Sequence, residues 1–164
     1  MLSKLTNVLL IAVCLAVIGQ IVYSHVAGRT APLPQQAASN MVKVGDVLKA
    51  PLPAAPVIAL AIASRCHFCV DSMPFYRQVA ATPAVKSGRV KLMAFTYEPE
   101  ETLRAFLKTQ GLGDMPISNE GWKASGASGT PTIFRLDAAH KVEKVWNGKM
   151  RDVKAEQDFL AGLA

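Results

Sequence analysis

Two cysteines, Cys66 and Cys69, are the side chains of this sequence best suited to chemistry. They follow an apolar run, residues 57–63, that predicts a buried strand, and they stand where a helix is expected to begin. Residues three apart in the first turn of a helix share a face, so the two sulfurs can come within bonding distance. The pattern therefore predicts a redox-active dithiol that can close to a Cys66–Cys69 disulfide.

The two cysteines are not expected to be equivalent. Unpaired N–H groups and the positive end of the helix dipole favour a thiolate at Cys66. Cys69 lies one turn deeper, which suits a thiol that resolves a mixed disulfide formed through Cys66. A partly protonated His67 would favour the thiolate further, and the alternative is a solvated loop histidine. Phe68 is expected to be half-exposed and either to shield the disulfide or to contact a partner.

Other uses of a Cys-x-x-Cys pair fit this sequence less well. A purely structural disulfide across so small a loop would constrain little of the unfolded chain. A c-type haem site needs a histidine directly after the second cysteine, and Val70 stands there instead. A metal site needs a third and a fourth ligand, which the sequence does not supply near the pair. We therefore expect no metal and no diffusible cofactor.

Length and composition allow one domain and an appendage within 164 residues. Three cysteines are too few for a disulfide scaffold, and Cys14 falls inside an apolar stretch near the N-terminus. The 18 basic and 12 acidic residues are scattered without a block of like charge, which favours a solvated surface. Basic and aromatic residues do not alternate, so no nucleic-acid partner is expected.

The first part of the sequence predicts a membrane anchor and a tether. Residues 1–7 form a polar, cytoplasmic tail, and residues 8–27 are apolar enough to cross a bilayer as one helix. A cleaved signal peptide is the alternative, although its apolar region would ordinarily be shorter. Residues 28–45 are rich in Ala, Pro, Gln and Ser and predict a linker, which leaves residues 46–164 as the folded domain.

The orientation of this anchor follows from charge and from the dithiol. Lys4 precedes the span and only Arg29 follows it closely, which slightly favours a cytoplasmic N-terminus. Stable disulfide chemistry also belongs outside the cytosol. We therefore predict a single-pass protein of the inner membrane whose domain lies in the periplasm or another extracytoplasmic space.

The domain sequence predicts alternating strands and helices. Strand, helix, strand and helix followed by a hairpin and a last helix imply an α/β fold, a mixed sheet with helices on both faces. A short strand at 42–44 and an edge segment at 47–48 precede them. The expected strands are 57–63, 89–97, 132–136 and 142–146, and the expected helices are 66–82, 98–110, 117–124 and 152–163.

This order of elements, from Pro56 to Leu163, resembles the thioredoxin fold, and three motifs support the resemblance. The Cys-His-Phe-Cys sequence at 66–69 stands at the strand-to-helix turn. Pro74 lies where helices of this family carry a kink, and Thr130-Pro131 stands where the family keeps a cis-proline facing the dithiol. With its anchor and tether, the chain resembles membrane-bound bacterial thiol–disulfide oxidoreductases of the thioredoxin-like class.

The resemblance implies exchange of disulfides with protein substrates and with a redox partner protein. A monomer is expected, because the tether offers no dimerisation segment. A cis peptide bond before Pro131 would turn the Thr130 backbone toward the sulfurs, where an extended substrate could pair with it. The alternatives are a module for metal- or haem-related cofactor assembly and a redox-silent binding domain. The strand before the dithiol lacks the carboxylate familiar from cytosolic thioredoxins, so Asp71 or Glu98 would accept the proton of Cys69 only if the fold brings them close.

Overall fold

The computed structural model describes Gln20 and residues 41–163. Contacts divide the chain into two units, Met1–Gln36 and Ala37–Ala164, and every strand and helix described below belongs to the second. The predicted tail at 1–7 and most of the predicted linker lie outside the described residues. So does the predicted membrane span at 8–27, except for Gln20. Among the described residues, no helix has the length and hydrophobicity needed to cross a membrane.

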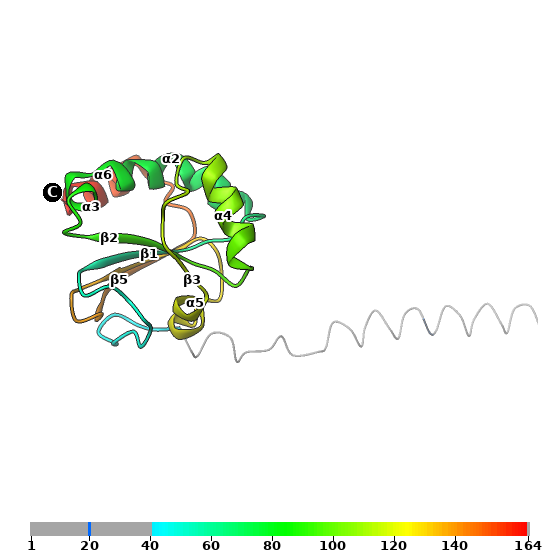
Figure 1. Ribbon diagram of the computed structural model, residues 1–164, viewed down its shortest axis with the longest axis horizontal. Coiled ribbons are helices and arrows are strands. Elements are labelled where there is room, and N and C mark those ends of the chain that lie inside the picture. The colour runs from blue at the N-terminus through cyan, green and yellow to red at the C-terminus, as the bar shows by residue number, and fades with distance from the viewer. Residues whose placement is uncertain (1–19, 21–40, 164) are drawn as a thin grey trace, which may run out of the picture. The chain divides into compact units, whose positions relative to one another are not determined.

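The second unit holds five strands and five helices in its described part, and Figure 1 shows their arrangement. Every strand predicted by the sequence from 57 onward forms, as do the helices expected at 66–82, 98–110 and 152–163, with ends within about two residues of the expected ones. In chain order the elements are β1 (Val57–Ala61), α2 (His67–Ala81), α3 (Pro83–Lys86), β2 (Lys91–Phe95), α4 (Glu100–Thr109), β3 (Ile117–Ser118), α5 (Asn119–Ser125), β4 (Thr132–Leu136), β5 (Val142–Asn147) and α6 (Val153–Ala161).

The sheet has the strand order β3-β2-β1-β4-β5, with β1 at its centre. β1 runs parallel to β2 and antiparallel to β4, so the predicted mixed sheet is confirmed. All five residues of β1 are buried. A strand covered on both faces needs apolar residues at every position, which explains the continuous apolar run in the sequence.

Side chains of β1 alternate between two hydrophobic cores. Ile58 and Leu60 point into the first core, which α2, α4 and α6 complete with residues such as Met73, Leu103 and Phe159. In Figure 1 these helices lie together on one side of the sheet. The fold therefore places the helix that follows the dithiol over a well-packed sheet face.

The second core lies on the other face of the sheet, where α5 packs. Phe95 and Phe134 contribute its large rings, at a centroid separation of 6.3 Å. α5 comes so close that a Cβ added to Gly121 would lie 2.2 Å from Cε1 of Phe95. Helices therefore cover both faces, as the sequence predicts.

Several chain segments meet at one end of the sheet, where β1 finishes. Ala61, the last residue of β1, pairs with Phe95 on one side and with Thr132 on the other. Thr132 in turn pairs with Asn147 at the end of β5. Because of this register, the segments that follow β1, β2 and β5 and the segment that precedes β4 all lie at the same end of the sheet. The cysteines lie at this end.

Two local predictions differ from the structure. No strand forms at 42–44, because Gly45 adopts a φ of +100° and the carboxylate of Asp46 accepts the N–H of Lys43, which makes a turn. The expected helix at 117–124 is instead the two-residue strand β3 followed by α5, whose first turn is capped by the hydroxyl of Ser118.

The last residues of the predicted linker contact the domain. The N–H of Val42 donates to the carbonyl of Ser125 at 3.0 Å, and the N–H of Gly45 donates to the carbonyl of Val142 at 2.8 Å. Val47 forms an isolated antiparallel bridge with Lys141, which agrees with the predicted edge segment. Residues from 42 onward therefore pack with the domain rather than extending away from it.

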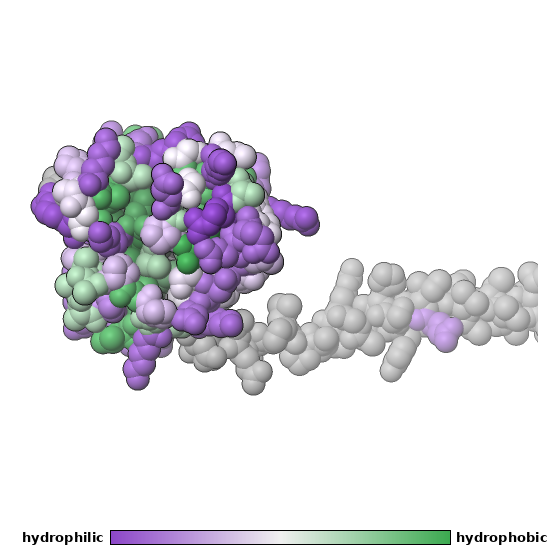
Figure 2. All heavy atoms as spheres, in the orientation of Figure 1, coloured by the Kyte–Doolittle hydropathy of each residue, from purple (hydrophilic) through white to green (hydrophobic). Residues whose placement is uncertain are grey.

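The surface of the domain is mixed in character. Figure 2 shows hydrophilic side chains spread over the visible face, with hydrophobic side chains between them. This distribution agrees with the scattered charges of the sequence, 18 basic and 12 acidic.

Candidate active site at the Cys66–Cys69 pair

Cys66 occupies the N-cap position of α2. Its backbone is extended, with φ −82° and ψ 111°, and its sulfur accepts the N–H of Cys69 at 3.2 Å. A helix N-terminus has N–H groups with no partner inside the helix, and here one of them points at a sulfur. Both cysteines are free thiols, Cys66 partly exposed and Cys69 buried. The first turn of α2 thus presents a backbone N–H to the sulfur of Cys66, which is the more accessible of the two sulfurs.

The Thr130–Pro131 segment lies against the dithiol, and its peptide bond is cis, as expected from the resemblance. The thiol of Cys66 donates to the carbonyl oxygen of Thr130 at 3.3 Å. The antiparallel pairing of β1 with β4 explains this contact, since Ala61 lies opposite Thr132. Cys66 is thus held between the first turn of α2 and the backbone that precedes β4.

Cys69 is chemically different from Cys66, although only three residues separate them. Its side chain is fully buried beneath the first turn of α2. Burial, and then the hydrogen bond with Cys66, raise the pKa of the Cys69 thiol to about 12. Cys69 is therefore a protonated thiol at neutral pH, as a resolving thiol would be before its partner arrives.

His67 and Phe68, between the cysteines, both face outward. The His67 side chain is 82% exposed, and its Nε2 lies 3.6 Å from a carboxylate oxygen of Asp71, one turn further along α2. Phe68 is 50% exposed and its ring lies 5.8 Å from that of His67. The roles predicted for these two side chains, tuning of the thiol and contact with a substrate, stay predictions.

A groove of about 680 Å³ begins at Phe68 and runs along the segment that joins β5 to α6. Its walls include the ring of Trp146 and the side chain of Met150, with the basic groups of Lys149 and Arg151. No local pattern in the sequence links these residues to the dithiol, because nearly eighty positions separate them from it. The pairing of β4 with β5 brings the groove residues to the end of the sheet at which the dithiol lies.

The two carboxylates considered as proton acceptors have other partners. Asp71 forms an ion pair with Lys149 at 3.3 Å. Glu98 accepts two hydrogen bonds from Ser64, from its N–H at 2.8 Å and from its hydroxyl at 3.0 Å. Ser64 belongs to the turn before Cys66, so the fold brings Glu98 to the active-site loop. No sequence signal indicated that Ser64 would be its partner.

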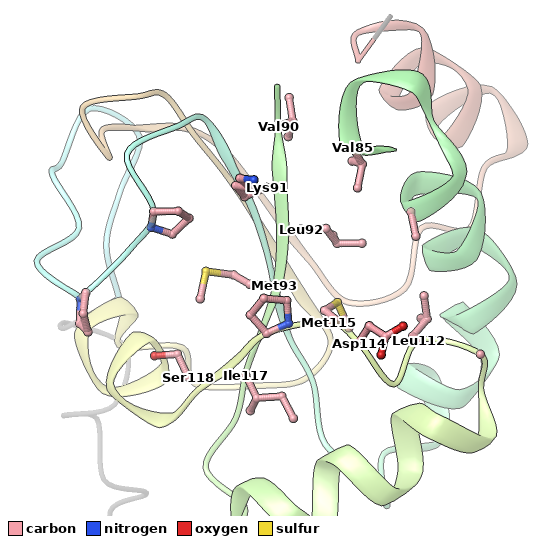
Figure 3. A pocket seen from close by; sticks show the side chains of 15 residues that line it. Val85, Val90, Lys91, Leu92, Met93, Leu112, Asp114, Met115, Ile117 and Ser118 are labelled. Atoms are coloured by element: carbon pink, nitrogen blue, oxygen red, sulfur yellow. The ribbon is translucent and has the colours of Figure 1, made fainter. Parts of the chain in front are cut away.

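A second cavity, of about 770 Å³, lies elsewhere on the domain and is shown in Figure 3. Its lining is mostly apolar, with Val85, Val90, Leu92 and Met115 among the labelled side chains. It lies along β2 at Lys91 to Met93, before the point where the short strand β3 begins to pair. The predicted chemistry did not depend on this cavity.

Within the described part of the chain, no group of three or more His, Cys, Asp and Glu side chains could hold a metal ion. Cys66 and Cys69 could supply two sulfur ligands, and a structural zinc site needs four ligands. The described residues therefore give no complete donor set at the dithiol.

No protein-family model matches this sequence, and no curated protein sequence matches it either. Solved structures do. A thiol:disulfide interchange protein of the thioredoxin family from Chlorobium tepidum is 25% identical, with a TM-score of 0.52 over 68% of this chain and 80% of its own. The domain has a thioredoxin-like fold.

Two further solved structures support this thioredoxin-like assignment. A secreted Mycobacterium tuberculosis disulfide oxidoreductase homologous to E. coli DsbE is 15% identical, with a TM-score of 0.53, and the match covers 68% of this chain and 82% of that one. The protein dsbF of the same organism, solved in mixed oxidized and reduced forms, is 17% identical with the same score and coverage. At these identities the similarity establishes the shared fold.

Proposed function

We propose that this protein is a thiol–disulfide oxidoreductase that exchanges disulfides with other proteins through Cys66 and Cys69. The observation that carries the proposal is the geometry of Cys66. Its sulfur caps α2, accepts the N–H of Cys69 at 3.2 Å and lies 3.3 Å from the carbonyl oxygen of Thr130. A partly exposed sulfur at a helix N-terminus, with a buried thiol behind it, is suited to nucleophilic attack followed by resolution.

The exchange proceeds in two balanced steps. The Cys66 thiolate attacks one sulfur of a partner disulfide, so a Cys66–partner bond forms and the second partner sulfur leaves as a thiolate. Cys69 then loses its proton, which the departing thiolate can accept, and attacks Cys66. The Cys66–Cys69 disulfide forms, two electrons have passed to the partner, and the partner is released with one thiol and one thiolate, which takes a proton from water. The reverse sequence oxidises a partner dithiol, and a second protein restores the starting state.

Substrate binding in this proposal uses the surfaces beside the sulfurs. The backbone at Thr130 and Pro131 lies against Cys66 and offers an edge to an extended chain. Phe68 offers an exposed apolar ring next to the groove. His67 is proposed to favour the thiolate of Cys66, and its Nε2 lies 3.6 Å from a carboxylate oxygen of Asp71.

We also propose that the domain works outside the cytoplasm, tethered to the inner membrane by residues 8–27. The length and hydrophobicity of this segment support the anchor, and the redox chemistry supports an oxidising compartment. Carbonate-resistant pelleting with the membrane fraction is the expected behaviour. A mature protein whose N-terminus lies near residue 25 or 28 would instead indicate a cleaved signal peptide.

A glutathione redox titration of the full chain in detergent tests the function. Cys14 is changed to Ser so that only Cys66 and Cys69 report. We expect one two-electron transition between dithiol and disulfide, together with catalysed reduction of insulin. A folded protein that forms no Cys66–Cys69 disulfide at any glutathione ratio, or that forms it without catalysing exchange, would contradict the proposal. Stoichiometric metal in the purified reduced chain would favour a role in cofactor assembly.

A further inference from the structure

The turn that presents Cys66 is fastened by a single carboxylate. Ser64 donates its N–H to one oxygen of Glu98 at 2.8 Å and its hydroxyl to the other at 3.0 Å. The two residues are 34 positions apart and both are partly buried, so the contact is a tertiary clamp.

Glu98 is itself held at both ends of its backbone. Its N–H donates to the hydroxyl of Thr96 at 3.1 Å. Its carbonyl accepts a hydrogen bond from the side chain of Asn119 at 2.8 Å, and the same amide donates to the carbonyl of Thr96 at 2.7 Å. Because Asn119 is the first residue of α5, the carboxylate extends from a point fixed by both β2 and α5.

The clamp acts close to the reactive sulfur. Only Arg65 separates Ser64 from Cys66, and the N–H of Cys66 donates to the carbonyl of Ala63 at 3.2 Å. The turn is therefore closed by one backbone bond and fixed from outside by Glu98. A small rotation in this turn would move the Cys66 sulfur away from the Cys69 N–H that it accepts.

We propose that Glu98 is a positioning residue for Cys66. By taking both hydrogen-bond donors of Ser64, it fixes the turn so that the sulfur stays at the N-cap of α2 and beside Thr130. What matters in this role is the reach of the side chain and a hydrogen-bonding group at each of its two terminal positions, rather than its negative charge. The consequence for disulfide exchange rests on the proposed function, whereas the effect on the sulfur itself does not.

Two substitutions at Glu98 separate reach from charge. Glu98→Asp keeps the charge but shortens the side chain by one methylene, so the clamp on Ser64 is lost. Glu98→Gln removes the charge but keeps the length, an oxygen acceptor for the N–H of Ser64 and an amide N–H that can donate to the Ser64 hydroxyl. Ser64→Ala removes one of the two donors and leaves Glu98 unchanged. Glu101→Asp, on the exposed first turn of α4, is the matched control.

The measurement is the rate at which iodoacetamide alkylates Cys66 at pH 7 in the reduced full chain with Cys14→Ser, followed by peptide mass. We expect Glu98→Asp, which loses both hydrogen bonds to Ser64, to slow alkylation about fivefold. Ser64→Ala, which loses one of them, should slow it about two- to threefold. Glu98→Gln and Glu101→Asp should stay within about 1.5-fold of the parent. Circular dichroism confirms that each variant is folded.

Equal rates for Glu98→Asp and the parent would overturn the proposal. A change in Glu98→Gln as large as that in Glu98→Asp would also overturn it, because the charge would then be the active feature. If Glu98→Asp does not fold, an unchanged rate in Ser64→Ala contradicts the proposal by itself. Alkylation needs neither a partner nor a redox cycle, so failure of the glutathione titration remains a separate result.

Discussion

Two hollows of similar volume lie on this domain, and only one adjoins reactive groups. The cavity beside β2 has about 770 Å³ and the groove beside Phe68 about 680 Å³. The cavity is lined mostly by apolar side chains, and its two charged lining residues are Lys91 and Asp114. The groove begins within the dithiol motif and contains part of the ion pair that links Lys149 to α2. Volume therefore does not locate the site, but the positions of thiols and polar partners do.

The difference follows from the sheet. The groove lies at the end of the sheet where β1, β2 and β5 finish and β4 begins, so loops from distant parts of the chain meet there. The cavity lies further back along β2, at Lys91 to Met93. Among the described strands, β3 pairs only with Ala94 and Phe95 of β2. On this side of β2, residues 91–93 therefore face the cavity instead of a neighbouring strand. The groove beside Phe68 thus forms where loops converge, and the cavity beside β2 forms because β3 is short.

The largest effect is expected at Cys66. Cys66→Ser should lower the rate of insulin reduction roughly a thousandfold or more, because the attacking sulfur is lost. Cys69→Ser should also abolish turnover, but it should accumulate a mixed disulfide through Cys66, since attack remains possible and resolution does not. Non-reducing electrophoresis of membranes from cells that carry each variant measures this. Equal trapping by both variants would contradict the assigned order of attack.

The matched variant at the other hollow is Ala80→Leu. Ala80 lies on the same helix as the dithiol, α2, but lines the cavity beside β2. A larger apolar side chain there should fill space and leave the rate of insulin reduction within about twofold of the parent. A loss as severe as that of Cys66→Ser would show that the comparison between the two hollows is wrong.

The next largest effect is on the free energy of unfolding at high pH. The folded pKa of Cys69, about 12, is raised above its unfolded value of 9.0. Above pH 9 the unfolded chain loses a proton that the folded chain keeps, so stability is full below pH 9 and falls as pH rises toward 12. For one proton the slope approaches about 1.4 kcal/mol per pH unit. Denaturant unfolding of the reduced protein measures it.

Lysines and tyrosines also titrate in this range, so the control is Cys69→Ala measured in parallel. The difference between the two stability curves isolates the contribution of Cys69. Stability of the variant should change less steeply with pH than that of the reduced parent. Parallel curves from pH 9 to 12 would indicate that Cys69 is not protected from ionisation in the folded protein.

A smaller effect is expected from Phe68, the apolar ring that opens onto the groove. Phe68→Ala should raise KM for a protein disulfide about fivefold, because an exposed aromatic anchor is lost, and should not change the rate with oxidised glutathione. Val44→Ala removes another exposed apolar side chain, from the segment before β1, and should change neither. Equal losses with glutathione and with protein would assign Phe68 to the chemistry instead of to partner contact.

The sequence predicted the local framework of this site well. A Cys-x-x-Cys pair after a run of buried residues fixes both a strand end and a helix start, because apolar continuity and N-capping are encoded by adjacent residues. Cys69 is buried, as predicted, and Cys66 is at the N-cap, one residue before the helix that was expected to begin with it. The cis bond before Pro131 was available only through the resemblance, since nothing adjacent to it indicates its geometry.

What the sequence did not predict depends on register. The partnership of Ser64 with Glu98 requires β1 and β2 to pair in parallel with Ala61 opposite Phe95. The position of Lys149 next to Asp71 requires β5 to lie beside β4. Such contacts form between residues that have no shared local pattern. The groove and the clamp were missed for this reason, whereas the positions of Cys66 and Cys69 at the start of α2 follow from a local pattern.

The smallest effect is expected from the ion pair that joins the two sides of the groove. Asp71 on α2 and Lys149 after β5 approach to 3.3 Å, with about a third of each side chain exposed. Pairs of this kind contribute little, so Asp71→Asn should lower the free energy of unfolding by about 0.5 kcal/mol. A double-mutant cycle with Lys149→Gln should return a coupling of the same size, smaller in 1 M salt because ions screen it.

The same cycle distinguishes support of the groove from participation in the chemistry. If Asp71 and Lys149 only hold α2 against the segment after β5, alkylation of Cys66 should stay within about twofold in Asp71→Asn, since neither group bonds to the sulfur. Glu143→Gln, which breaks the 2.9 Å pair with Arg135 on the sheet, is the control for loss of an exposed ion pair. A severalfold change in Asp71→Asn that Glu143→Gln does not reproduce would mean that the carboxylate acts on the dithiol, directly or through the imidazole of His67 at 3.6 Å. The site would then extend one helical turn beyond Cys69.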